Sequence, residues 1–166
     1  MKKYHRLARI VLAATAAQLA VSTIAAAATC ASPVEKAALD TRVLQSELMV
    51  AALTCGQNAN YNAFVEKFQP VLVTFGQTMR SYFTRAYGKG GEHEMDAFVT
   101  RTANSAATRR MQFEMTQYCA SANNLFSSVL AVESKALPEF AGQTPFAAIS
   151  GVESCPAQAA RDPSSN

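Results

Sequence analysis

Four cysteines, widely separated along the chain, constrain the fold more than any other feature of the sequence. Cys30, Cys55, Cys119 and Cys155 form an even set without any C-x-x-C spacing. Structural zinc, thiol redox centres and covalent haem use closely spaced cysteines, because one turn of chain then supplies two of the ligands. The pattern instead predicts two disulfides that join distant segments, and we expect no cofactor.

The N-terminal segment indicates export to a compartment in which disulfides form. A basic stretch without acids, residues 1–9, precedes an uncharged stretch that ends in four alanines at 25–28. This order is typical of a secretory signal peptide. We expect residues 1–28 to be cleaved, leaving the protein periplasmic or secreted, where disulfides persist. A membrane anchor is the alternative, but the stretch contains polar residues and no basic stop-transfer cluster follows it, so we expect no stable membrane span.

The predicted cleavage changes the electrostatics of the protein. The chain of 166 residues has a formal net charge of +3, from 15 Lys and Arg against 12 Asp and Glu. Four of the basic residues and none of the acids lie in residues 1–28, so the mature chain has a net charge of −1. The basic character therefore belongs to the export signal and gives no reason to expect nucleic-acid binding.

Apolar residues recur at helical spacing and no alternating β pattern of useful length occurs, which predicts an all-α fold. A capping box at Ser32 and Glu35, with Pro33 at the first helical position, predicts a first helix. We expect this helix to continue to Cys55 and to stop at Gly56, because glycine readily adopts the left-handed conformation that ends a helix.

A second helix is expected from Asn58 or Asn60 to Gly88, because its aromatic and aliphatic residues keep one helical register throughout. The register survives Pro70. A proline removes one backbone hydrogen bond, so the pattern predicts one long helix that is kinked near Gln69-Pro70.

Two more helices complete a predicted four-helix up-down bundle within a single domain, residues 29–155. The third is expected from about Glu92 to Cys119. The fourth is expected to start at a cap of Ser121 or Asn123 and to carry apolar residues from Leu125 to Leu137, where Pro138 ends it. We expect the segment after this proline to pack back on the bundle and residues 156–166 to be disordered.

The same topology predicts how the cysteines pair. The ends of the first and third helices share one pole of such a bundle, which brings Cys55 to Cys119. The start of the first helix and the segment after the fourth share the other pole, which brings Cys30 to Cys155. The first and third helices can lie diagonally, however, and a disulfide needs Cα atoms within about 7 Å. We expect the kinked second helix to relieve that separation.

The mature chain offers little for catalysis, because its one histidine is His93. His93 and Asp96 lie three residues apart on one helical face and are a weak candidate for holding a metal ion. Acids at a helix start more commonly complement the helix dipole. We therefore predict no catalytic residue and no metal site, and an enzyme of unknown type is the third of the functions considered.

Two sets of residues are candidates for binding. The kink could open a cavity for a small apolar ligand, lined by Phe64, Phe68 and Phe75, although aromatics at helical spacing more often form core. Basic residues and tyrosines near the glycine-rich loop at 88–91 could instead dock an acidic partner, such as a periplasmic protein or an envelope polymer. The residues assigned to this basic face are Arg80, Tyr82, Arg85, Tyr87 and Arg101.

Three segments carry a resemblance to other proteins: VLQSELMVAALTCG at 43–56, YNAF at 61–64 and YFTRAYG at 82–88. With them, the chain resembles uncharacterised small exported helical proteins of Gram-negative bacteria over about residues 34–119. The resemblance implies a periplasmic location and supplies no particular activity.

A disulfide-linked helical scaffold with few catalytic side chains favours a non-enzymatic protein that binds another protein or acts in the cell envelope. A carrier of small apolar ligands is the alternative. The two differ in one structural respect: a carrier requires an enclosed apolar cavity, whereas a protein binder has a filled core and an exposed apolar patch.

Overall fold

The computed structural model describes residues 29–156. Apart from one isolated parallel bridge between Ala31 and Ser154, the regular elements of this part of the chain are helices, which confirms the all-α prediction. None of these helices is both long enough and apolar enough to cross a membrane. The expected signal peptide, residues 1–28, lies outside the described residues, as does the expected disordered tail, 156–166, except for Pro156.

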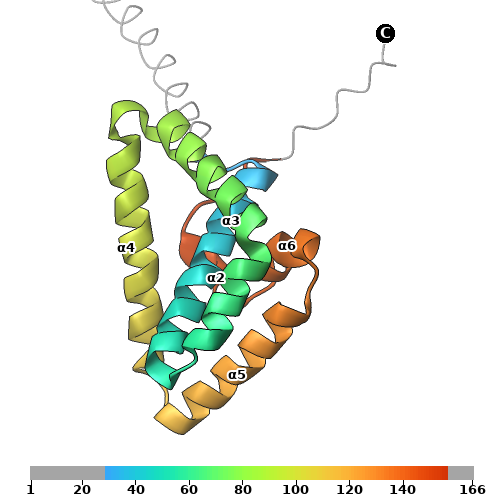
Figure 1. The fold of residues 1–166 in the computed structure, drawn as a ribbon. Helices are drawn as coiled ribbons and strands as arrows, with labels where there is room; N and C mark the ends of the chain where they lie inside the picture. Colours follow the sequence, from blue (N-terminus) through green and yellow to red (C-terminus); the bar gives the residue numbers. More distant parts are fainter. Residues whose placement is uncertain (1–28, 157–166) are drawn as a thin grey trace, which may run out of the picture.

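The helices alternate in direction along the molecule, which confirms the predicted up-down order (Figure 1). A central antiparallel pair is flanked by one helix that runs along one side and another that diverges on the other side. The helices are α2 (Pro33–Cys55), α3 (Asn58–Tyr87), α4 (Gly91–Arg110), α5 (Met115–Ala131) and the short α6 (Leu137–Gly142), with 3-10 turns η2 (Gly88–Gly90), η3 (Ser134–Ala136) and η4 (Ala147–Ser150).

Helix α2 begins and ends where the sequence predicts. The Glu35 carboxylate accepts a 2.8 Å hydrogen bond from the backbone N–H of Ser32, and the Ser32 hydroxyl accepts one from the backbone N–H of Glu35. Gly56 follows the last turn with a φ of 68°, which favours glycine. Its N–H donates to the carbonyl of Ala52, so the end of α2 satisfies one of its own carbonyls.

Helix α3 continues through Pro70, as predicted, and bends along its length (Figure 1). The proline cannot donate a backbone hydrogen bond to the carbonyl four residues earlier. Burial on both sides of the proline holds the helix together: Phe64 and Phe68 before it, and Met79 and Phe83 after it, are all buried.

The predicted boundary between the third and fourth helices is wrong. Helix α4 stops at Arg110 instead of continuing to Cys119, and α5 begins at Met115, six to eight residues before the predicted caps Ser121 or Asn123. Cys119 therefore lies near the start of α5. A straight continuation of α4 would have carried this cysteine about 13 Å beyond Arg110 at 1.5 Å per residue.

The turn between α4 and α5 contains no glycine or proline, so no local signal marked it. The N–H groups of Gln112 and Phe113 bond to the carbonyls three residues earlier, which tightens the chain after α4. Glu114 is then extended, with φ −60° and ψ 142°, and α5 starts after it. Tertiary packing, and not local propensity, ends the helix here.

The end of the fourth predicted helix also differs. Helix α5 ends at Ala131, and Pro138 lies in the first turn of α6, where a proline loses no intrahelical hydrogen bond. The chain after it packs back on the body, as predicted: Ala141 and Ala147 are buried. Its last part reaches the start of the described chain, where the N–H of Ala31 donates to the carbonyl of Glu153 over 2.9 Å.

Helix α2 is the centre of the fold, because α3, α4, α5 and α6 all pack against it. One buried cluster joins Leu48 of α2 to Phe64 of α3 and Phe126 of α5. A second cluster joins Leu39 of α2 to Phe98 of α4. The aromatic stripe of α3 contributes to both clusters, so its main role is to fill the core.

Both predicted disulfides are present, one at each pole. Cys55 and Cys119 are joined with a Cα separation of 5.6 Å, and Cys30 and Cys155 with a separation of 4.8 Å. The first bridge does not span a diagonal, because Cys119 belongs to α5 and α5 packs directly on α2.

Removing either disulfide should lower stability strongly. The bridges span 64 and 125 residues of chain, and loop-closure entropy assigns about 4 to 5 kcal/mol to loops of this length as an upper figure. We expect the paired substitution of Cys55 and Cys119 by serine to lower the melting temperature by more than about 10 °C. Melts with and without reductant test this expectation, and an unchanged melt after verified reduction would contradict it.

Two adjacent glycines at the start of α4 provide a matched test of the packing. A Cβ at Gly91 would lie 2.7 Å from the backbone oxygen of Phe83, whereas a Cβ at Gly90 would meet nothing within 4 Å. We expect Gly91→Ala to destabilise the protein by about 1–3 kcal/mol and Gly90→Ala to be close to neutral. Urea unfolding measures both, and equal stability of the two variants would argue against this close approach of α3 and α4.

Candidate functional site

The aromatic residues predicted to line a cavity do not act together. Phe64 and Phe68 are fully buried in the core, with ring centroids 5.2 Å apart, and neither lines the groove between α2 and α3 or the cavity beside α5. Phe75 alone is half-buried beside an open groove between α2 and α3. The structure does not bring the three residues together around one cavity, because Phe64 and Phe68 lie in the core and Phe75 lies beside the groove.

Two residues assigned to the basic face have structural roles. Tyr82 is 1% exposed, and its hydroxyl donates a 2.7 Å hydrogen bond to the carbonyl of Thr29. Arg85 forms a 2.8 Å ion pair with Glu35 and donates to the carbonyl of Cys30. These contacts fasten the end of α3 to the start of α2, so Tyr82 cannot offer exposed area to a partner.

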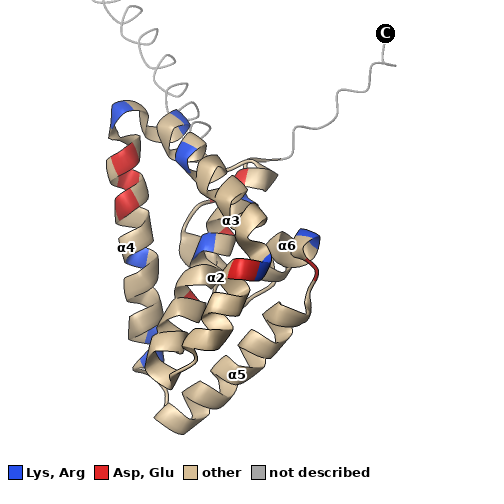
Figure 2. Ribbon diagram, in the orientation of Figure 1, with Lys and Arg blue, Asp and Glu red and all other residues tan. Residues whose placement is uncertain are grey.

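The other members of the basic face are spread over the molecule. Arg80 and Tyr87 are exposed near the end of α3, and Tyr87 stacks on Phe83 with centroids 5.9 Å apart. Arg101 lies about 15 Å along α4 from Gly91. Acidic residues of the first turns of α4 lie between them, as Figure 2 shows. The structure therefore does not gather the five residues on one continuous basic face.

The weak metal candidate is also exposed. His93 and Asp96 both lie on the surface of the first turns of α4. Within residues 29–156, no group of three or more His, Cys, Asp and Glu side chains is placed to hold a metal ion.

The strongest candidate site is an apolar cavity of about 330 Å³ beside α5, here called the α5 cavity. It lies near the Cys55–Cys119 pole, and its walls come from α2, the end of α4, α5 and the segment after α6. The lining residues are mainly apolar or aromatic, which is the usual character of a binding pocket. They are Glu47, Ala51, Arg109, Phe113, Tyr118, Ser121, Ala122, Leu125, Pro145 and Phe146.

A partly buried ion pair forms the polar edge of the α5 cavity. Glu47 of α2, 7% exposed, pairs with Arg109 of α4. The Arg109 guanidinium also lies over the Phe146 ring, 5.9 Å from its centroid. Burial raises the pKa of the Tyr118 phenol, although the nearby charges of Arg110 and Arg109 act in the opposite direction. The phenol is therefore neutral at pH 7 and offers a polar group beside an apolar wall.

Large apolar side chains are exposed next to this cavity. Met111, Phe113 and Met115 lie in or beside the turn between α4 and α5 and are 70%, 47% and 48% exposed, respectively. We call these three residues the Met–Phe–Met turn. The sulfur of Met115 lies 3.9 Å from the sulfur of Cys119, so the nearby disulfide fixes this end of the turn.

Sequence reasoning missed the Met–Phe–Met turn because it placed these residues inside one long helix. Their spacing carried a signal against that prediction. Apolar residues at i, i+2 and i+4 do not share one face of a helix, in which neighbours at i+3 and i+4 do. A helix through this segment would have exposed at least one of the three whatever its orientation.

Comparison of the chain with protein-family models, curated proteins and solved structures gave no match. No relative therefore supplies a function or a site. The resemblance to small exported helical proteins stays a prediction.

The Arg85–Glu35 contact makes a prediction about acid stability. Burial acts to raise the pKa of Glu35, but hydrogen bonds from Arg85 and Ser32 and the charge of Arg85 outweigh it and hold this pKa below its usual 4.5. A carboxyl with a lowered folded-state pKa stabilises the fold above its unfolded pKa, and this contribution is lost as the pH falls through the folded-state pKa. We expect Glu35→Gln to be less stable than the wild type at pH 7.

This difference should shrink as the pH falls below about 5. Urea unfolding at several pH values measures it, with Glu66→Gln at an exposed position of α3 as the control. A constant difference between Glu35→Gln and the wild type from pH 7 to pH 3 would contradict the role given to this carboxyl.

Proposed function

We propose that the protein is an exported, non-enzymatic binding module that docks another protein at the α5 cavity, in the periplasm or at the cell envelope. The observation that carries the proposal is the Met–Phe–Met turn beside the apolar cavity. Exposed apolar groups next to a pocket are typical of interaction sites. The side chains of Phe64 and Phe68 fill the core, which favours a protein binder over a carrier with an internal cavity.

Two features support a location outside the cytosol. The N-terminal sequence has the form of an export signal. Both disulfides join distant segments of the chain, and such bridges form and persist in oxidising compartments. The Cys55–Cys119 bridge also holds α5 against α2, so the α5 cavity is built on a fixed scaffold.

The chemistry of the site indicates what kind of segment would dock there. An aliphatic or aromatic side chain of the partner fits the α5 cavity, and Phe113 and the flanking methionines provide contact area around it. Methionine adapts its shape easily to a partner. A polar hollow along α4, lined by Arg101 and Arg109, adjoins this site. We therefore expect an apolar anchor flanked by acidic residues.

A photo-crosslinking experiment tests the proposal. A benzoylphenylalanine residue is placed at position 113 of the α4–α5 turn or, as the matched control, at position 87 near the other pole, where Tyr87 is 43% exposed. Both replace an exposed aromatic side chain. We expect a specific crosslinked partner from position 113 and not from position 87.

Affinity of the identified partner gives the quantitative test. We expect Phe113→Ser to weaken binding about tenfold or more, as loss of an aromatic anchor does, and Tyr87→Ser to leave it little changed. Crosslinks at position 87 alone, or at neither position, would contradict docking at the α5 cavity. The first of these results would place the partner near the end of α3.

A further inference from the structure

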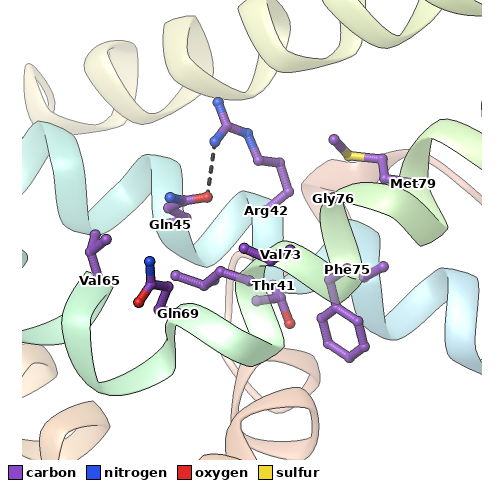
Figure 3. Close-up of a pocket in the computed structure, with 11 residues that line it drawn as sticks. Thr41, Arg42, Gln45, Val65, Gln69, Val73, Phe75, Gly76 and Met79 are labelled. Carbon is purple, nitrogen blue, oxygen red and sulfur yellow. Dashed lines mark hydrogen bonds between the residues drawn. The ribbon is translucent and has the colours of Figure 1, made fainter.

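A second cavity, of about 390 Å³, lies between α2 and α3 and is here called the α2–α3 groove (Figure 3). It is separate from the α5 cavity, with which it shares no lining residue. Apolar side chains of α3, among them Val73, Phe75 and Met79, form one wall. Polar side chains of α2 form the other: Thr41, Arg42 and Gln45.

Arg42 is the unusual member of this groove. Its guanidinium donates a 2.9 Å hydrogen bond to the side-chain oxygen of Gln45, the dashed line in Figure 3. Its Nε is buried without a hydrogen-bond partner, and no carboxylate within residues 29–156 forms an ion pair with it. By contrast, Arg85 pairs with Glu35 and Arg109 pairs with Glu47.

A partly buried cation without a counter-charge costs free energy, because it loses part of its solvation and gains no ion pair. Burial accordingly lowers the pKa of Arg42. Arginine nevertheless keeps its charge at neutral pH. The α2–α3 groove therefore presents a fixed positive charge beside an apolar wall.

Thr41, the neighbour of Arg42 on α2, supplies an independent observation. Its side chain is 1% exposed, yet its hydroxyl has no hydrogen-bond partner among the described residues. Buried hydroxyls are nearly always hydrogen-bonded, so an orphan that lines a groove indicates a missing acceptor or donor. The Thr41 hydroxyl and the Arg42 guanidinium point in opposite directions (Figure 3), so they do not form one shared site, and the charge of the groove comes from Arg42 alone.

Gly76 keeps the groove open. It lies on the same stripe of α3 as Val73 and Met79, three residues before and after it, and all three line the groove. A Cβ at this glycine would meet nothing within 4 Å. The position is inside a helix, where glycine is unfavourable relative to alanine by about 1 kcal/mol. No neighbouring atom requires a glycine at this position, but a larger side chain here would extend into the groove.

We propose that the α2–α3 groove binds a small organic anion, whose carboxylate pairs with the Arg42 guanidinium and whose apolar body packs on Val73, Phe75 and Met79. The planar guanidinium suits a carboxylate, which it can bind through two parallel hydrogen bonds. The apolar wall is available for contact, because Val73 is 56% exposed. This site is independent of the protein docking proposed above.

Octanoate and its neutral counterpart 1-octanol are the probes, with binding measured by calorimetry and by chemical shifts of groove residues. We expect octanoate to bind and 1-octanol to bind about tenfold or more weakly, because a charge-assisted hydrogen bond is lost. Equal binding of the two compounds, or no binding of octanoate at millimolar concentration, would overturn the proposal.

Two variants locate the site. We expect Arg42→Gln to weaken octanoate binding about 10- to 100-fold and Gly76→Leu, which fills the groove, to abolish it. Lys89→Gln removes an exposed cation of η2 outside the groove and should leave octanoate binding unchanged. Octanoate binding that survives both Arg42→Gln and Gly76→Leu would overturn the proposal.

The stability of the ligand-free variants gives a separate readout. If Arg42 is kept for binding, its removal relieves a partly buried charge without an ion-pair partner, and Arg42→Gln should melt at the same temperature as the wild type or higher. A clearly lower melting temperature for Arg42→Gln, together with unchanged octanoate binding, would show that the arginine is structural.

Discussion

Burial of α2 on all sides is the constraint on which the rest of the structure depends. A central helix of this kind is expected to be apolar all round, yet α2 buries Asp40, Thr41, Ser46 and Glu47 among its aliphatic residues. Each buried polar group needs a partner, because losing water without gaining a hydrogen bond is costly. The surrounding helices are therefore positioned by polar contacts as well as by hydrophobic packing.

Helix α4 illustrates this effect. Ser46 of α2 lies 3.2 Å from the hydroxyl of Thr102, and Glu47 pairs with Arg109. Thr102 and Arg109 are seven residues apart, close to two helical turns, so the two contacts fix α4 at two points along its length. The same ion pair forms the polar edge of the α5 cavity. Thr41, five residues before Ser46 on α2, has no hydrogen-bond partner among the described residues, and it lines the α2–α3 groove.

Much of the fold could be predicted from local signals. The capping box at Ser32, the glycine stop at Gly56 and the unbroken register across Pro70 each depend on residues within one or two turns. The disulfide pairing followed from topology. The turn after Arg110 could not be predicted in the same way, because no residue there breaks a helix and long-range packing of α5 on α2 decides where it ends.

The candidate sites were harder to predict from the sequence than the fold, because they depend on tertiary structure. An exposed aromatic and a buried one look alike in a periodic pattern. The sequence therefore places Phe113 in the third helix, and it leaves Phe64 and Phe68 open between the core and the wall of a cavity. Tyr82 is a similar case. The basic residues near it in the sequence suggest an exposed position, but the structure buries it, and its hydroxyl donates a hydrogen bond to the carbonyl of Thr29. Arg42 gave no signal at all, because the absence of a carboxylate near it is a property of the folded chain.

The Cys30–Cys155 bridge has a mechanical consequence. It joins residues that are 125 positions apart and lie close to both ends of the described chain. A force applied to the two ends would be carried by this covalent bond, and the helices between the two cysteines would bear almost none of it. Tension could not then extend the body of the protein unless the bridge was first reduced.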